Sequence, residues 1–525
     1  MSAPTSPDNV DVLVVGAGPT GLMLANQLAR RGVRPLIIDR HSGPAQQSRA
    51  VVVQARTMEI YAQLGIVEKA IEQGLEGTGF NMWSRGRWRA KIPFGEIGRG
   101  LSPFPSLLVL GQDDNELIMG AHLKGLGVEV QWNTELVAFT QQPGHVDATI
   151  RQPEGKMRAI TARYVAGCDG ARSPVRELSR IGFPGAPYEH VFYVADTEAT
   201  GSMVPNEVNV YLWRDGFHLF FPMRGKDRWR VIGILPEELR GRDDLVFAGV
   251  EPSIRDEAGA NLSFKACAWF STYRIYHRAA EKFQDRRIFL MGDAAHIHSP
   301  AGAQGMNTGL QDAYNLAWKL ALVAQGRADE RLLATYAAER MPVAQRLLKS
   351  TDRLFTLLVS KGLFGMLLRT RLAPRFLAFG MTVERVRRLA FYTISQIGIH
   401  YRRSPLSKTL VGVAERAPQA GDRFPWLQLR FQPNGPVEDL FRKLDDLHFN
   451  LIVTGQAAPT LSGNLVRVHA VPADAANAKE LARVGIAGPA YYLLRPDGHV
   501  GLAGTLFDAS VTSRYLADCG LRASA

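Results

Sequence analysis

The sequence predicts an α/β protein, α+β overall, in which a parallel-sheet domain is interrupted by a sheet-rich domain and followed by a smaller α/β domain. Three observations predict this fold class. A glycine-rich turn joins a β-like run to a helix-like run near the N-terminus. Alternating strands dominate residues 190–275, and the chain of 525 residues exceeds one ordinary core.

The composition is that of a globular protein with a basic balance. The formal net charge of +12 either steers anions, such as phosphate-bearing cofactors and acidic or phenolate substrates, or only makes the surface basic. No basic block is interleaved with aromatic residues, so nucleic acid is excluded as a partner. Cys168, Cys267 and Cys519 form neither a CxxC nor a metal spacing, and no signal-peptide pattern precedes the first strand. We therefore expect a cytoplasmic protein with no disulfide framework and no metal.

The N-terminal turn carries a G-x-G-x-x-G frame between a strand at 12–15 and a helix over about 21–31. The first glycine permits a tight turn, the second lets backbone N–H groups approach a pyrophosphate, and the third lets the helix pack closely on the strand. The helix N-terminus favours the diphosphate charge. The frame predicts a Rossmann-like dinucleotide site whose candidate residues are Gly16, Gly18, Pro19, Thr20 and Gly21.

An acidic residue closes the second strand, at 34–39, about 20 residues after the glycine frame. Asp39 is placed there to accept hydrogen bonds from the two ribose hydroxyls, and it would repel a 2′-phosphate. FAD or NAD is therefore favoured over NADP at this site.

Two later segments complete the predicted parallel-sheet domain. After a hairpin that turns on Gly155, a strand runs into Cys168 and the segment "GCDGARSPVR" at 167–176. A buried strand within "RRIFLMGDAAH" ends at Gly292, and helical patterning follows over about 305–324.

The second of these segments has the features of a binding loop. Asp293 follows the carboxyl end of a strand, where α/β sheets bind ligands. The loop from Ser299 to Asn307 is rich in Gly, Ala and Pro, so its backbone can approach a flat ring. The helix that starts near Gly305 aims its positive end at that ring and would stabilise negative charge there.

Together the three motifs resemble the G-x-G-x-x-G, D-G and G-D motifs of the class A FAD-dependent aromatic hydroxylases, the single-component flavoprotein monooxygenases of the p-hydroxybenzoate hydroxylase superfamily. The resemblance covers about residues 1–350. The runs "WFSTYRIYHRAAEKF" and "GDAAHIHSPAGAQGMNTGLQDAYNLAWKL" look most like the phenol hydroxylase and pentachlorophenol monooxygenase branch.

The resemblance also implies how the chain is divided. We expect a discontinuous FAD-binding domain (1–185 and 280–350), a substrate-binding β-sheet domain (186–279), a helical segment (351–417) and a thioredoxin-like C-terminal domain (418–525). The stretch "PQAGDRFP" looks like a linker, and strands are expected at 451–454, 466–471 and 491–495. The C-terminal domain lacks CxxC, so we interpret it as structural or as a contributor to a homodimer.

On the adenosine side, the resemblance implies three contacts to non-covalent FAD. Asp39 would hold the ribose, Arg49 would approach the diphosphate, and Gln112 would lie beside the ribityl or adenosine part. Arg56 matches a recurrent position, for which a local salt bridge is the alternative interpretation.

Around the flavin ring, the resemblance implies that Asp169 and Arg176 of the D-G motif serve both FAD and NADPH. Asp293 would bond the ribityl chain. The remaining implied cofactor-binding residues are Arg40, Gly292, Pro300, Gly305, Met306 and Asn307, of which the last four would line the pyrimidine edge of the isoalloxazine.

The implied reaction consumes NAD(P)H and O₂. NAD(P)H reduces the flavin, O₂ adds at C4a, and the hydroperoxide transfers one oxygen atom to a phenolic or related aromatic ring. A group that favours the phenolate raises the nucleophilicity of the ring, and a dry pocket protects the hydroperoxide. No separate nicotinamide domain is visible, so NAD(P)H is expected to bind transiently. The expected partners are a small aromatic substrate, O₂ and NAD(P)H.

Candidates for the group that polarises the phenol lie on the strand-like run 269–276. Alternation places Trp269 and Tyr273 on one face, and Arg274 and Tyr276 on the other. The branch uses an Arg and a Tyr from about this strand, which makes Arg274 and Tyr276 the catalytic candidates, with sheet packing as the alternative. His218 is a further candidate. The branch also has an acidic residue near the position of Val51, and its absence here argues against a carboxylate-assisted deprotonation.

Residues 354–400 are apolar and basic. Lys361 interrupts their apolar run, which is too short to span a bilayer, so no membrane span is predicted. We expect packed helices with a basic outer face, and a helix that lies on a membrane surface is the alternative.

Two rival functions stay open at the level of sequence. One is a hydroxylase or epoxidase of a larger, polyketide-type aromatic, which longer loops around the pocket would favour. The other is a flavin-binding redox sensor without oxygenase turnover, against which the complete pyrimidine loop argues.

Overall fold

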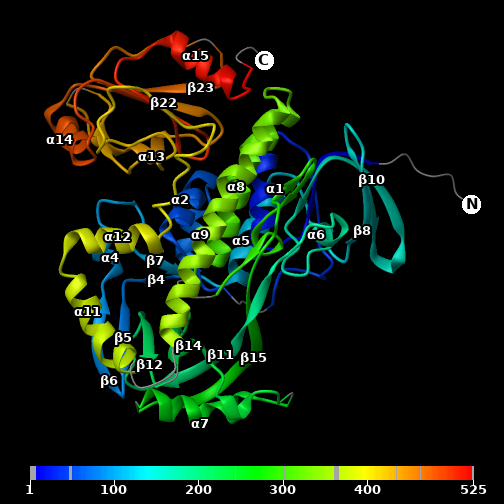
Figure 1. Ribbon diagram of the computed structural model, residues 1–525, viewed down its shortest axis with the longest axis vertical. Helices are drawn as coiled ribbons and strands as arrows, with labels where there is room; N and C mark the ends of the chain where they lie inside the picture. The colour runs from blue at the N-terminus through cyan, green and yellow to red at the C-terminus, as the bar shows by residue number, and fades with distance from the viewer. Residues whose placement is uncertain are drawn as a thin grey trace, which may run out of the picture.

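A computed structural model describes most of the chain and shows the mixed α/β class that the sequence predicts (Figure 1). The described residues are 8–46, 50–214, 216–242, 244–259, 261–299, 303–359, 366–432, 434–461 and 463–522. Arg49 and Pro300, both expected at the cofactor, lie outside these ranges.

The first β-α-β unit forms a parallel sheet at the N-terminal end of the chain. β1 (Asp8–Val15) pairs in parallel with β2 (Pro35–Ile38) and with β10 (Met157–Gly167), and α1 (Pro19–Arg30) connects the first two strands. The carboxyl-terminal half of β1 is aliphatic and buried, as expected for a strand covered on both faces. The sheet is completed by β8 (Glu135–Gln141), β9 (Val146–Arg151), β16 (Gln284–Asp285) and β17 (Ile288–Leu290).

Four long helices pack against one another beside this sheet. α1 packs against α5 (Gln112–Gly125) and α8 (Gly305–Ala324), and α8 packs against α9 (Ala334–Val359). The helix predicted over 305–324 is confirmed at both ends. Residues 307–323 of α8 are all buried, so this helix is the centre of the fold. Figure 1 shows it crossing the middle of the molecule.

The second sheet has eight strands in the order β18-β15-β11-β14-β13-β12-β5-β6. It includes β5 and β6, which lie within the range 1–185 and so outside the substrate domain expected from sequence. Helix α7 (Phe247–Ala258) packs against β12 and β15. The strands are β5 (Phe80–Ser84), β6 (Arg87–Ile92), β11 (Gly185–Thr200), β12 (Val208–Leu212), β13 (Phe217–Pro222), β14 (Arg228–Ile234), β15 (Ser263–Ala279) and β18 (His296–Ile297).

Short elements join the two large sheets. A three-stranded sheet holds β3 (Val52–Val53), β7 (Leu107–Val109) and β4 (Leu75–Gly77). The helices around it and on the outer edge are α2 (Ala55–Leu64), α3 (Val67–Gln73), α4 (Phe94–Ile97), the π-helical turn η5 (Leu368–Leu372), α11 (Ala373–Gly380) and α12 (Glu384–Ile394). The short helix α6 (Pro174–Leu178) packs against β8, β10 and β17 of the first sheet.

The C-terminal domain is built on a mixed five-stranded sheet in the order β19-β25-β24-β22-β23, beside a two-stranded sheet. The strands predicted at 451–454, 466–471 and 491–495 are present. The elements are β19 (Lys408–Thr409), β20 (Gln428–Arg430), β21 (Val437–Asp439), α13 (Leu440–Lys443), β22 (Phe449–Thr454), β23 (Val466–Val471), α14 (Ala475–Arg483), β24 (Ala490–Leu494), β25 (Val500–Gly504) and α15 (Ala509–Asp518).

This domain shares its core with the first one. Phe449, Leu451 and Tyr491 belong to the same buried cluster as β1 and α8. The linker expected at 418–425 is wrong, because Ala420 and Phe424 are buried in the domain core. Glycine and proline in this stretch mark packed turns rather than a flexible connection.

Candidate functional site

The glycine-rich turn between β1 and α1 uses its three glycines differently. Gly16 has a φ of +103°, and a Cβ there would lie 2.3 Å from the carbonyl oxygen of Cys168. A Cβ on Gly21 would lie 1.9 Å from the carbonyl oxygen of Gly16. At Gly18 the nearest atom to a Cβ would be Glu116 Oε1, at 4.0 Å. Packing within the chain therefore explains the first and third glycines, whereas the backbone at Gly18 is open to a ligand.

The start of α1 joins this turn to the G-D segment. A Cβ on either Gly292 or Gly309 would collide with the side chain of Thr20, so the three residues pack closely. Pro19 occupies the first turn of α1, which contains no acidic residue. An anion at this N-terminus would meet the positive end of the helix without a competing carboxylate in that turn.

Asp39 braces the glycine turn from the end of β2. One carboxylate oxygen accepts the Ala17 N–H at 2.7 Å. Its neighbour Arg40 is exposed, and Gln112, at the start of α5, donates its amide to Glu116 at 2.8 Å. The carboxylate of Asp39 thus lies beside the open backbone at the turn, and its hydrogen bond to a ribose stays a prediction.

The D-G segment lies against the same turn and holds an unpaired acceptor. Asp169 Oδ2 accepts the Val175 N–H at 2.9 Å, whereas Oδ1 is buried and has no hydrogen-bond partner among the described residues. Burial raises the pKa of this carboxyl to about 6, against the opposing hydrogen bond from Ser173. Arg176 donates to the carbonyl of Ala294 at 3.0 Å, which ties the D-G segment to the G-D segment.

The G-D segment is held from behind by α8 and α9. Gly292, with a φ of +56°, donates its N–H to Asp312 at 3.1 Å, and His296 Nε2 lies 2.7 Å from the same carboxylate. Arg340 donates to Asp312 at 2.6 Å; burial would raise the pKa of Asp312, but Arg340 and His296 lower it. Asp293 is exposed although both of its neighbours are buried. The ion-paired network around Asp312 therefore holds the G-D segment in place, with Asp293 on its exposed side.

The first turn of α8 commits its side chains inward. Asn307 is buried, accepts the Gln54 N–H at 2.8 Å and donates to the carbonyl of Val52 at 2.9 Å. Met306 Sδ accepts the side-chain amide of Asn115 at 3.4 Å. The first turn from Gly305 holds no acidic residue. The backbone N–H groups of this helix end, rather than its side chains, are what it offers to a ligand.

Alternation along β15 is confirmed, and its two faces meet different surroundings. Phe270 packs toward α7, against Tyr193 and Phe247. The opposite face packs into the core that also contains Ala303, in the loop before α8. We name this second surface the ring-loop face; its residues are Val194, Val210, Leu219, Phe221, Ile232, Trp269 and Tyr273.

The three residues predicted to be catalytic do not lie on the ring-loop face. Arg274 is exposed and shares the α7 side of β15 by strand alternation. Tyr276 lies on the same side, with the guanidinium carbon of Arg278 4.8 Å from its ring centroid. His218 is fully buried, with Nε2 2.8 Å from a carboxylate oxygen of Glu257 on α7. Alternation alone does not say which face of a strand meets the loop, and the catalytic roles of these residues stay predictions.

Sequence reasoning missed a buried arginine on the ring-loop face. Arg230 is 3% exposed and forms two 2.6 Å hydrogen bonds to the carboxylate of Asp196. Its guanidinium carbon lies 5.6 Å from the ring centroid of Trp269. Arg230 Nη1 is buried and has no hydrogen-bond partner within the part of the chain that the structure describes. A charged pair at facing positions of two apolar strands, "FYVADTEA" and "RWRVIGIL", is the sequence signal that marks it.

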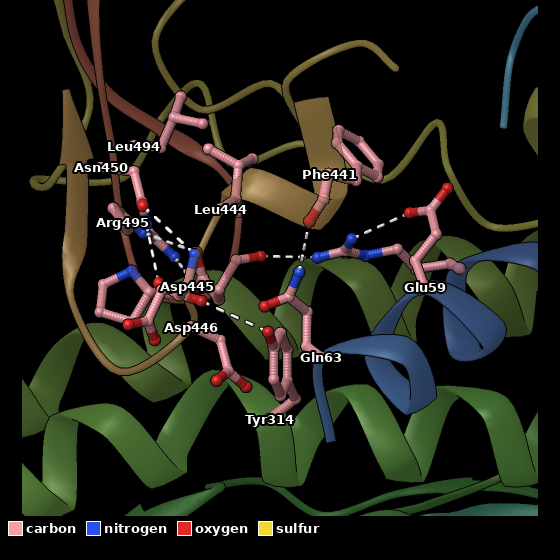
Figure 2. A pocket seen from close by; sticks show the side chains of 14 residues that line it. Glu59, Gln63, Tyr314, Phe441, Leu444, Asp445, Asp446, Asn450, Leu494 and Arg495 are labelled. Carbon is pink, nitrogen blue, oxygen red and sulfur yellow. Dashed lines mark hydrogen bonds and ion pairs between the residues drawn. The ribbon is translucent and has the colours of Figure 1, made fainter. Parts of the chain in front are cut away.

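A narrow cleft lined largely by polar residues lies between α2, α8 and the C-terminal domain (Figure 2). Its groups are paired with one another: Arg56 donates to the carbonyl of Asp497 at 2.6 Å and forms a 3.0 Å ion pair with Glu59. Gln63 donates to the carbonyl of Phe441 at 3.0 Å. The salt-bridge interpretation of Arg56 is confirmed, and this cleft is a seam between domains. Across the described ranges, no cluster of His, Cys, Asp and Glu is placed to hold a metal ion.

Comparisons with known proteins agree with this geometry. Residues 9–351 match the family model described as "FAD binding domain". The chain is 36% identical to 6-methylpretetramide 4-monooxygenase of Streptomyces rimosus over 77% of this chain and 72% of that protein. It is 32% identical to pentachlorophenol 4-monooxygenase of Sphingobium chlorophenolicum over 82% and 78%. The solved structure of aklavinone-11 hydroxylase with FAD and aklavinone has a TM-score of 0.79 and 25% identity, over 98% of this chain and 100% of that one.

Proposed function

Because this chain belongs to the FAD-dependent aromatic monooxygenases, we propose that it uses NAD(P)H and O₂ to hydroxylate a phenolic or related aromatic ring. The observation that carries the proposal is that three segments far apart in the sequence meet at one edge of the first sheet, where backbone and carboxylate groups are open to a ligand. The glycine turn, the D-G segment and the G-D segment contact one another there, and the ring-loop face shares a hydrophobic cluster with Ala303, just before α8.

The residues at this edge fit FAD. The open backbone at Gly18 and the start of α1 suit the diphosphate. Exposed Asp293 and the unpaired oxygen of Asp169 are acceptors for ribityl or ribose hydroxyls. The first turn of α8 offers backbone N–H groups to the pyrimidine edge. Bound there and reduced by NAD(P)H, FAD supplies the electrons that activate O₂.

The residues of this chain contribute to the chemistry by binding the aromatic ring, excluding water from it and polarising it. The ring-loop face is aliphatic and aromatic, which suits a flat apolar substrate and excludes water. Arg230 Nη1 is the buried donor on that face, and we assign it the substrate oxygen. A guanidinium N–H on that oxygen favours the phenolate over the phenol, which raises the nucleophilicity of the ring carbon.

A larger, polyketide-type aromatic is the second candidate substrate. Two observations favour it: the relative at 36% identity is named for 6-methylpretetramide, and the solved structure with a TM-score of 0.79 contains aklavinone. The relative at 32% identity is named for pentachlorophenol, a single ring. Both substrate classes carry a phenolic oxygen that Arg230 could bind. They therefore differ in the size of the pocket that they need rather than in the chemistry of hydroxylation.

A panel of aromatics tests the proposal. The purified, FAD-loaded protein is given NADH or NADPH with simple phenols and with fused polyketide phenols, and both cofactor oxidation and oxygenated product are measured. We expect one class to stimulate oxidation at least about 10-fold with matching product. Failure of every aromatic to stimulate oxidation or to yield product would contradict it.

A further inference from the structure

The outer face of α11 and α12 exposes large apolar side chains that no described segment covers. Phe376 and Phe379 on α11 are 68% and 71% exposed, and Leu389 on α12 is 68% exposed. Val383 and Val386 add to the same surface, and a Cβ on Gly380 would lie 3.4 Å from Val386, so the two helices are in contact. We name these five residues, Phe376, Phe379, Val383, Val386 and Leu389, the α11–α12 patch. A clustered apolar surface of this kind marks an interaction site.

The helix that carries Val386 and Leu389, α12, is firmly anchored. Phe391, on the inner face of α12, is buried in the core of the ring-loop face. Just after α12, Gln396 donates to the hydroxyl of Thr308 at 3.0 Å and accepts from Gln311 at 2.6 Å, both on α8. Exposure of Leu389 is therefore a property of the packed helix, whose inner and outer faces are both apolar.

The charges on the segment that carries the patch are mostly positive. Residues 361–400 contain seven Lys and Arg and a single acidic residue, Glu384. That glutamate lies 3.6 Å from Arg388. Arg371, Arg375 and Arg385 are exposed beside the apolar side chains. Figure 1 shows α11 and α12 at an outer edge of the molecule, and α11 packs against β6.

From these observations we propose that the α11–α12 patch binds the surface of an anionic lipid bilayer. Phenylalanine and leucine side chains enter the boundary between headgroups and acyl chains, and the surrounding arginines contact lipid phosphates. A second copy of this chain fits less well, because a two-fold contact would bring the same arginines together. The described helices include none that is long and apolar enough to cross a membrane, so contact at the surface is the form of binding proposed.

Sedimentation with vesicles tests the proposal on the full-length FAD-loaded protein. The probes are vesicles of phosphatidylcholine alone and of phosphatidylcholine mixed equally with phosphatidylglycerol. We expect the protein to sediment with the anionic vesicles only, and to be released as salt shortens the Debye length below about 10 Å. No sedimentation with anionic vesicles at low salt would overturn the proposal.

Two variants and a control locate the contact. Phe376→Ser with Phe379→Ser should lower vesicle partitioning at least about 10-fold while leaving FAD content and thermal unfolding unchanged. Arg375→Gln with Arg385→Gln should reduce the preference for anionic vesicles. Leu506→Ser removes a 70% exposed leucine from the C-terminal domain and should have no effect.

Two results count against the patch as a lipid site. Undiminished binding by the phenylalanine double variant would do so. Light scattering that shows a dimer which this variant abolishes, with no vesicle binding, would assign the patch to a second copy instead. Neither readout measures turnover, so the proposal can fail while the proposed function stands.

Discussion

In the proposed function, Arg230 is the residue that recognises the substrate oxygen at the ring-loop face. The guanidinium donates from Nε and Nη2 to the carboxylate of Asp196, and these two hydrogen bonds fix the plane of the group. The direction of the buried Nη1 N–H groups is therefore fixed as well. A buried N–H without a partner costs about 1–3 kcal/mol, a cost that a bound oxygen removes. Lysine at this position would keep the charge but lose the two-pronged pairing.

Arg230→Lys should therefore lower coupled turnover at least about 10-fold, with NAD(P)H still consumed and hydrogen peroxide released instead of product. Arg274→Lys is the matched control, because it changes an exposed arginine on the opposite side of the same sheet. Product and peroxide are measured against NAD(P)H consumed. If Arg274→Lys uncouples the enzyme and Arg230→Lys does not, the family-implied role of Arg274 holds and our assignment fails.

Asp293 offers a test of the cofactor edge. Removing its carboxylate in Asp293→Ala should weaken FAD binding about 10- to 150-fold, since a charged hydrogen bond contributes about 1.5–3 kcal/mol. Fold should be retained, because the side chain is exposed. Flavin fluorescence on dilution measures the affinity, with Glu177→Ala, an exposed acid on α6, as the comparison. Equal retention of FAD by both variants would remove Asp293 from the site.

At the scale of elements, local sequence patterns predicted those helices, strands and turns whose formation depends on residues close in the sequence. The β1-α1-β2 unit and the bounds of α8 follow from glycine spacing and apolar periodicity. The addition of β5 and β6 to the second sheet depends on pairing between Phe80 and Val208, which no local pattern records. The same limit explains why alternation on β15 was correct although the catalytic candidates, Arg274 and Tyr276, were chosen from the face that does not meet Ala303: which face meets Ala303 depends on tertiary packing.

Asn307 connects elements that position the candidate site, so its loss should lower both the stability of the protein and its FAD occupancy. It connects α8 to β3 and to the residue before α2. Asn307→Ala removes the hydrogen bonds to the Gln54 N–H and to the Val52 carbonyl, so the free energy of unfolding should fall by about 1–3 kcal/mol and FAD occupancy should fall with it. Chemical denaturation and bound flavin report the two effects. A variant that is stable and fully loaded would show that α8 is positioned by apolar packing alone.

The whole molecule is held together by buried charge as well as by a shared core. Glu339 lies between Lys319, at 2.7 Å, and Arg495 of the C-terminal domain, at 2.6 Å, and all three are fully buried. Burial would raise the pKa of Glu339, but Arg495 and Lys319 lower it to about 2. The ion pair between Glu339 and Arg495 therefore ties the C-terminal domain to α9.

Because the pKa of Glu339 is lower in the folded protein than its ordinary value of 4.5, its contribution to stability is present above that pH and is lost as the pH falls toward about 2. Glu339→Gln should lower the free energy of unfolding at neutral pH by about 3–5 kcal/mol, since two buried cations lose their partner. It should also weaken the fall in the free energy of unfolding at acidic pH. Urea denaturation over a pH series measures both, with exposed Glu76→Gln as control. An unchanged fall at acidic pH would mean that other carboxylates govern acid unfolding.

The origin of the oxygen atom tests the central claim of monooxygenase chemistry most directly. The FAD-loaded protein is supplied with NAD(P)H and an aromatic that stimulates its oxidation, under ¹⁸O₂ in ordinary water, and the product is analysed by mass spectrometry. We predict one ¹⁸O atom per hydroxylated product, and none when the label is in the water instead. Product that takes its oxygen from water, or peroxide as the sole oxygen product with every aromatic that stimulates oxidation, would contradict the assignment.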